Sequence, residues 1–304
     1  MNNRYDFLFL FDAQDANPNG DPDAGNLPRI DVESGQGLVT DVCLKRKIRN
    51  FVAMTSNNAA GKRIYFTDGS VLNDLQQEAH DKIGIPAAES KSPKNGKKDQ
   101  ATAWMCENYY DVRTFGAVMS TEINCGQVRG PVQLSFARSI DPIVSSEHAI
   151  TRSSVTNKKD VEKERTMGRK FTIPYGLYKA QGFVNPFLAI QTGFSEGTNF
   201  GRKVDENGNA LTDDKSDLEL LFNALENAFQ FDQSAARPAG SMSPRALIVF
   251  KHDSKLGSAP SHKLFEAVVI KKKEGVEAPR SFSDYEVTID ESAIHESITL
   301  IRRI

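Results

Sequence analysis

Hydrophobic and polar positions along this chain of 304 residues follow two periods, and the period-two or unbroken apolar runs predict strands. The aromatic, mostly apolar run from Tyr5 to Asp12 predicts a buried strand, and Ala246 to Phe250 predicts a second because no polar residue interrupts it. Val128 to Ile140 alternates like a half-buried strand whose first half is weakened by Pro131. The remaining runs are Leu264 to Ile270 and Tyr285 to Ile289, both expected as strands, and the ambiguous tail Ile298 to Ile304.

A recurrence of apolar residues every three to four positions predicts helices. The clearest covers Asp217 to Gln230, where Ser216 and Glu219 form a capping box ahead of the apolar stripe. Thr40 can cap another helix that continues to about Met54. Two more helices are expected, from Ser70 to Ile83 before Gly84 and, with weaker periodicity, from Ala101 to Phe115.

Three polar stretches separate these elements. Residues 13–37 contain Asn17-Pro-Asn-Gly-Asp-Pro-Asp and predict a long loop, residues 88–100 predict a mobile insertion with four lysines, and residues 145–179 are too polar and basic for a core. The strong elements alternate strand, helix, strand, helix, strand, which indicates an α+β fold compatible with a ferredoxin-like or RNA-recognition sheet under two helices. No repeat or linker is visible, so a single discontinuous domain is expected over residues 1–304.

The composition excludes two classes of protein. The chain has 38 Lys and Arg against 40 Asp and Glu, a net charge of −2, and 39% hydrophobic residues. These values exclude a uniformly cationic nucleic-acid binder and a chain that stays disordered. Locally, residues 12–33 carry a charge of −5 and residues 151–172 a charge of +4.

Membrane and secretion signals are not recognised in the sequence. The longest apolar run near the start, Phe7 to Phe11, is far shorter than the about 20 residues of a membrane span, and Met1 to Asp12 lacks a signal-peptide pattern. We therefore predict a cytoplasmic protein without membrane contact. Cys43, Cys106 and Cys125 are too far apart for a Cys-x-x-Cys pair, and buried free thiols are expected.

The sequence contains partial matches to a calcium-binding loop and to a metal-dependent nuclease site. Asp15-x-Asn17-x-Asn19-Gly20 matches half of a calcium loop, but Asn26 replaces the bidentate Glu and a strand precedes it. A metal-dependent nuclease stays open, although Asp and Asn are also ordinary turn residues. No catalytic residue, metal ligand or cofactor is therefore assigned. The six acids that a nuclease could use are Asp12, Asp15, Asp21, Asp23, Asp31 and Glu33.

Basic clusters give the more specific signal. Lys45, Arg46 and Arg49 share one flank of the helix that begins after Thr40, and Arg169 and Lys170 follow Met167-Gly168 at the end of a basic stretch. Grouped cations suit a sugar-phosphate backbone, whose charge repeats along the strand. A solvated surface is the alternative, and it is favoured around Lys158, where acids interleave with the lysines.

Several motifs in one order resemble a known family. They are Asn17-Pro-Asn-Gly-Asp-Pro-Asp, Asp111-Val-Arg-x-Phe-Gly-Ala, Arg129-Gly-Pro-Val-Gln with Phe136-Ala-Arg-Ser-x-Asp, and Thr166-Met-Gly-Arg-Lys before Pro174-Tyr-Gly-Leu-Tyr. Together they cover nearly the whole chain and resemble the backbone subunit of the type I Cascade complex, in the CRISPR-associated RAMP superfamily, most closely its subtype I-C member.

This resemblance implies a modified RNA-recognition palm with inserted fingers and a thumb β-hairpin. The palm would cover about 1–56, 109–144 and 180–253, the fingers about 57–108, the thumb about 145–179, and further strands 254–304. Copies would stack head-to-tail along CRISPR RNA, beside other Cascade subunits for guide processing and the large and small subunits, and support guide pairing with target DNA without cutting. The implied RNA-binding residues are Lys45, Arg46, Arg49, Arg129, Arg152, Met167, Gly168, Arg169 and Lys170.

Two residue-level alternatives remain at this stage. Met167 could wedge between bases, or it could fill a core gap at the foot of a hairpin. Related backbone subunits of type III complexes cut RNA with a loop aspartate, for which Asp31 or Asp23 would be the candidate here.

Overall fold

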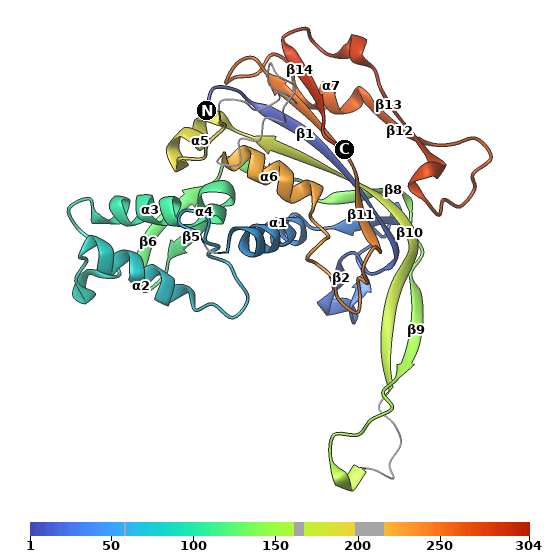
Figure 1. The fold of residues 1–304 in the computed structure, drawn as a ribbon, viewed down its shortest axis with the longest axis horizontal. Helices are drawn as coiled ribbons and strands as arrows, with labels where there is room; N and C mark the ends of the chain where they lie inside the picture. The colour runs from blue at the N-terminus through green and yellow to red at the C-terminus, as the bar shows by residue number, and fades with distance from the viewer. Residues whose placement is uncertain (58, 161–166, 198–215) are drawn as a thin grey trace.

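The computed structural model describes residues 1–57, 59–160, 167–197 and 216–304, and its centre is an antiparallel sheet (Figure 1). The strands are ordered β14-β11-β1-β10-β8-β4, with β7 and β9 also paired to β10. The mixed α+β class expected from the sequence is confirmed. The bounds of these strands are β1 Tyr5–Ala16, β4 Gln36–Val39, β7 Val132–Leu134, β8 Ala137–Pro142, β9 Ser146–Thr151, β10 Met167–Val184, β11 Met242–His252 and β14 Ile298–Arg302.

Both faces of β1 are buried, which explains its nearly unbroken apolar sequence. Phe7, Phe9 and Phe11 point into a cluster with helices α1 (Asp41–Ser56) and α6 (Asp217–Glu226). Leu8 and Leu10 point to the opposite face, under α7 (Ser261–Glu266) and the β12–β13 hairpin (Val268–Lys272, Tyr285–Ile289). The sheet is therefore the middle layer between two coverings (Figure 1).

A third apolar cluster forms a separate small core beside α1. It is built by α2 (Leu72–Ile83), α3 (Lys97–Asn108), α4 (Tyr110–Phe115) and the hairpin β5 (Gly116–Ser120) with β6 (Asn124–Arg129). This cluster continues past residue 108 as far as Val128, so the predicted boundary of the fingers lies inside it. The division into palm, fingers and thumb stays a prediction.

Strand β10 joins a protruding hairpin to the centre of the sheet. Its residues Met167 to Thr172 pair with β9, and from Ile173 onward the same strand pairs with β1. Figure 1 shows the β9–β10 hairpin leaving the sheet at one end. The predicted thumb boundary at residue 179 falls within this continuous strand.

Several sequence expectations need correction. β1 extends to Ala16, into the predicted loop, because its pairing with β10 and β11 continues beyond the apolar run. The expected strand 128–140 is split between β6, β7 and β8, since Pro131 cannot donate to a ladder. Leu264 to Glu266 is the end of helix α7, a short apolar run that periodicity cannot assign. α3 begins at Lys97, inside the expected insertion 88–100.

The predicted helices 40–54, 70–83 and 217–230 are present with ends shifted by a few residues, and the helix expected over 101–115 is divided between α3 and α4. Cys106 and Cys125 are buried and Cys43 is half-buried, all as free thiols. Among the described residues, no helix has the length and apolar character needed to cross a bilayer. The remaining elements are β2 Gly20–Asp21, β3 Leu27–Pro28, α5 Pro186–Thr192, and the 3-10 turns η1 Pro22–Ala24, η2 Ala87–Glu89, η3 Lys158–Asp160, η4 Phe282–Asp284 and η5 Glu291–Ala293.

Candidate nucleic-acid interface

The three cations predicted on the first helix line one pocket of about 570 Å³. Lys45, Arg46 and Arg49 form its α1 wall. The opposite wall is the turn Phe66 to Ser70 together with the α4–β5 junction at Phe115 and Gly116. We call this space the cation pocket. It combines positive charge with aromatic surface, the two features that single-stranded nucleic acids use.

The three cations differ in how free they are. Lys45 Nζ lies 2.8 Å from Asp41 Oδ2 and 5.7 Å from the centre of the Phe115 ring. Arg49 Nε donates to the buried Asp111 at 2.8 Å, and its guanidinium lies over Phe115. Arg46 is exposed, and within the described part of the chain it has neither a hydrogen bond nor an ion pair. Arg46 is thus the cation most available to a ligand, whereas Arg49 also supports the fold.

Asp111 on α4 organises the pocket wall, although it is recognisable in the sequence only within a family motif. Its carboxylate is fully buried and accepts hydrogen bonds from the backbone N–H of Tyr65 at 2.8 Å and of Phe66 at 3.1 Å. Together with the bond from Arg49, these contacts compensate the buried charge. One side chain therefore fixes both the Phe66 turn and the Arg49 guanidinium.

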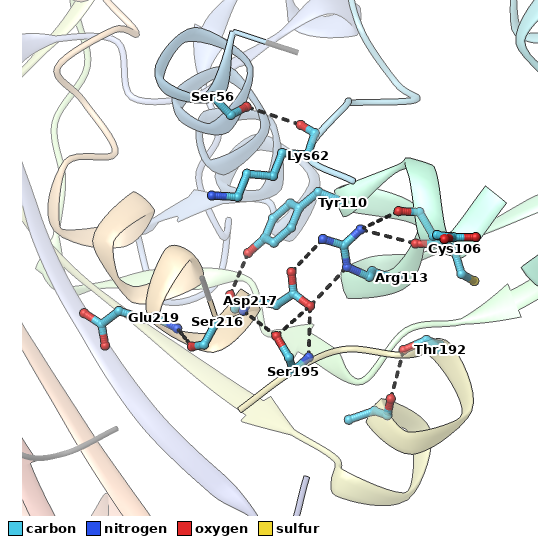
Figure 2. Close-up of polar contacts among 12 residues, drawn as sticks. Ser56, Lys62, Cys106, Tyr110, Arg113, Thr192, Ser195, Ser216, Asp217 and Glu219 are labelled. Carbon is cyan, nitrogen blue, oxygen red and sulfur yellow. Dashed lines mark hydrogen bonds and ion pairs between the residues drawn. The ribbon is translucent and has the colours of Figure 1, made fainter. Parts of the chain in front are cut away.

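Arg113, two residues later on α4, makes a second buried network (Figure 2). Its Nη2 donates to Asp217 Oδ1 at 2.6 Å and its Nε to Oδ2 at 3.1 Å. Asp217 Oδ2 also accepts from the backbone N–H of Ser195 at 2.9 Å, and Tyr110 Oη donates to the Asp217 carbonyl at 3.1 Å. Burial beside this carboxylate raises the pKa of Tyr110. The network attaches α4 to the beginning of α6.

The backbone of Arg129 lies beside the cation pocket. It pairs across the β5–β6 ladder with Gly116, a residue of the pocket wall. Its side chain is exposed and makes no hydrogen bond or ion pair to any residue that the structure describes. The close approach of the two strands requires glycine at position 130, because a Cβ there would lie 2.4 Å from the backbone nitrogen of Gly116.

The other predicted residues lie apart from the pocket, on the β9–β10 hairpin and just beyond β9. Met167 is 70% exposed, so the interpretation of Met167 as a core residue is wrong. Arg169 Nε lies 3.2 Å from Glu147, and Arg152 Nε donates to the carbonyl of Ser154. Gly168 pairs with Ile150, and Lys170 lies opposite His148. The nine predicted residues therefore form two groups, one at the pocket and one at the hairpin.

The acids of the first loop do not gather into one site. Asp12 is buried and accepts from Tyr175 Oη at 3.0 Å and Arg245 Nε at 2.8 Å. Asp31 pairs with Arg138 at 2.6 Å, and this bond lowers the pKa of the carboxyl. Over the described ranges, no group of three His, Cys, Asp or Glu side chains could hold a metal ion. Internal partners thus neutralise part of the local negative charge.

Two asparagines of the calcium-loop pattern make hydrogen bonds within the protein. Asn19 Oδ1 accepts from the backbone N–H of Thr40 at 2.9 Å, and Asn17 Nδ2 donates to the carbonyl of Asn26 at 2.7 Å. These two amides stabilise the loop and its junction with α1, as turn asparagines do.

The chain is an α+β protein with a central antiparallel sheet and a protruding hairpin. Its pocket of cations and aromatic rings is a feature found in proteins that bind nucleic acids. The chain belongs to the family of CRISPR-associated protein Cas7, whose sequence model matches residues 3–290.

The individual relatives share low sequence identity with this chain. The chain is 28% identical over 211 residues to the CRISPR-associated protein Cas7 of Haloferax volcanii, in an alignment that covers 64% of this chain and 60% of that protein. Two chains of solved structures are similar at 14% identity. One, from a "CRISPR RNA-guided surveillance complex, pre-nicking", has a TM-score of 0.45 over 81% of this chain and 78% of that chain. The other, from a "CRISPR RNA-guided surveillance complex", has a TM-score of 0.44 over 81% and 68%.

Proposed function

We propose that this chain is a non-catalytic backbone subunit of a cytoplasmic type I Cascade complex that binds the sugar-phosphate backbone of CRISPR RNA. The observation that carries the proposal is the cation pocket, where Lys45, Arg46 and Arg49 face two phenylalanines. Membership in the Cas7 family supports CRISPR RNA as the RNA that is bound. A pocket of this kind holds a strand through its charge and leaves base identity unread, as a guide-binding protein requires.

The strand order supports a ferredoxin-like palm. β1, α1, β8, β10, α6 and β11 follow one another along the chain, and their strands lie in the order β11-β1-β10-β8. This is the β-α-β-β-α-β arrangement with the first and third strands in the middle. We assign the segment between α1 and β7 as fingers and the β9–β10 hairpin as thumb.

The partners follow from this assignment. Copies of the chain would associate head-to-tail along the guide, with the exposed Met167 available to wedge between bases and Arg129, Arg152, Arg169 and Lys170 near phosphates. Target DNA would be held through its pairing with the guide, and other Cascade subunits would close the ends. The motifs favour subtype I-C.

Removing the two pocket cations that do not support the core tests the RNA site. Lys45→Gln with Arg46→Gln is expected to weaken binding of a CRISPR RNA about a hundredfold, because each of the two charged contacts contributes roughly 1.5 kcal/mol, or about tenfold. The slope of log affinity against log salt should become shallower by about 1.4, or about 0.7 per lost cation on a single strand. Filter binding across a salt series measures both.

The matched control is Lys271→Gln with Lys273→Gln, which removes the same charge from exposed positions on and just after β12. Equal weakening by both double variants would show a general charge effect and contradict the assignment of the site. Arg49 is left intact, since its loss would also leave Asp111 without its cation.

We also expect the complex not to cut RNA. Asp31, the candidate of the nuclease alternative, already accepts from Arg138 and from the backbone N–H of Glu33. Incubation of the assembled protein and guide with complementary RNA and magnesium should leave the RNA intact. Cuts at regular spacing that disappear in Asp31→Ala or Asp23→Ala would establish the alternative.

A further inference from the structure

The cation pocket continues along α1 into a second space of about 250 Å³. At this far end Lys45 and Arg46 no longer line the space, and Ala53, Met54, Ile64 and Phe231 are added to it. The groove therefore has a cationic end near the start of α1 and an aromatic end near its finish. Residues shared by both spaces are Arg49, Asn50, Phe66, Thr67 and Asp68.

The two aromatic rings at this end are held in place but not covered. The Phe231 ring packs on Phe51 at 6.0 Å between ring centres, and Phe66 packs on Tyr65 at 4.7 Å and under Arg49 at 5.2 Å. Phe231 nevertheless remains 44% exposed and Phe66 39% exposed. Both rings line the second space, and among the described residues no ring contact joins Phe66 to Phe231.

The polar residues of this lining also have hydrogen-bonding groups that the described residues do not use. The side chains of Asn50, Thr67 and Asp68 make no hydrogen bond or ion pair to the residues that the structure describes, and all three line the aromatic end. A purely apolar occupant would bury these groups without partners, which is costly. The lining therefore fits an occupant that combines an apolar face with polar edges.

We propose that the aromatic end of the groove binds an unpaired nucleobase of the RNA strand whose phosphates lie at the cationic end. A nucleotide carries an anionic phosphate and, a short distance away, a planar base with polar edges. The groove along α1 offers matching groups in the same order, with cations at one end and an aromatic ring at the other. Stacking on Phe231 would tolerate any base, because every base has a π face, whereas the Phe66 ring already lies under Arg49. This inference rests on the proposed RNA-binding function and adds a base site to it.

The test uses guide RNAs with single 2-aminopurine substitutions, whose fluorescence falls when the base stacks on an aromatic ring. With the wild-type protein at least one position should be quenched. Phe231→Ala should remove that quenching and weaken RNA binding roughly tenfold. Phe231→Leu keeps apolar contact with Phe51 but has no ring, and it should also fail to quench.

The control Phe187→Ala removes a phenylalanine on α5 that is 52% exposed and does not line the groove, and it should leave the quenching unchanged. Quenching that survives in both Phe231 variants, or is absent in the wild type while RNA still binds, would overturn the base site and leave the RNA-binding proposal standing. No binding of RNA at all would instead contradict the proposed function itself.

Discussion

Replacing Asp111 with alanine is expected to lower the free energy of unfolding by about 3–5 kcal/mol, because it breaks a buried ion pair on one side only. The carboxylate is fully buried and accepts from Arg49 and from two backbone N–H groups of the Phe66 turn. Alanine would leave all three donors without their acceptor. Since Arg49 and Phe66 belong to the wall of the cation pocket, RNA affinity should fall together with stability.

Urea unfolding followed by circular dichroism measures this loss as a lower midpoint. Asp23→Ala is the control, because Asp23 is exposed and its carboxylate is not hydrogen-bonded within the described ranges; its midpoint should match that of the wild type. A midpoint for Asp111→Ala within error of this control would show that the Asp111 contacts do not hold the pocket wall.

Replacing Asp217 with alanine should have an effect of similar size, about 3–5 kcal/mol, at the other side of α4. The carboxylate binds Arg113 through two hydrogen bonds and also accepts from Ser195 (Figure 2). Its loss would leave the Arg113 guanidinium, whose side chain is 10% exposed, without its anion. The α4–α6 contact should therefore loosen without any direct change at the cation pocket.

A double-mutant cycle isolates this pair. Because Arg113 and Asp217 are in direct contact, the costs of Arg113→Ala and Asp217→Ala should sum to more than the cost of the double variant, by about 0.5–3 kcal/mol. Additive costs would mean that the two side chains stabilise the fold independently.

Local signals explain what could be predicted from the sequence. The helix caps are found where the pattern placed them: Thr40 Oγ1 accepts from the N–H of Cys43, and Ser216 Oγ from that of Glu219. The capping box at Ser216 is only half formed, however, because the Glu219 carboxylate pairs with Arg303 instead. A partner 84 residues away leaves no trace in a local pattern.

The same limit applies to the candidate site. Helical periodicity correctly placed Lys45, Arg46 and Arg49 on one flank of α1. It could not show that Arg49 is committed to Asp111, which lies 62 residues further along the chain. Phe66 and Phe231 carried no pattern of their own, since they become neighbours of the groove only when α1 packs beside two distant turns.

The continuous strand β10 acts as a molecular ruler. Its 18 residues span about 60 Å at the ordinary rise of a strand, and the six that pair with β9 account for about 20 Å of that length. The same backbone hydrogen-bonds to β1 further along the strand, so no flexible hinge joins the hairpin to the sheet. The distance to which the hairpin extends is therefore set by the number of its residues. Inserting or deleting a residue pair in this arm would therefore change its length in steps of about 7 Å while preserving which side chains face which side.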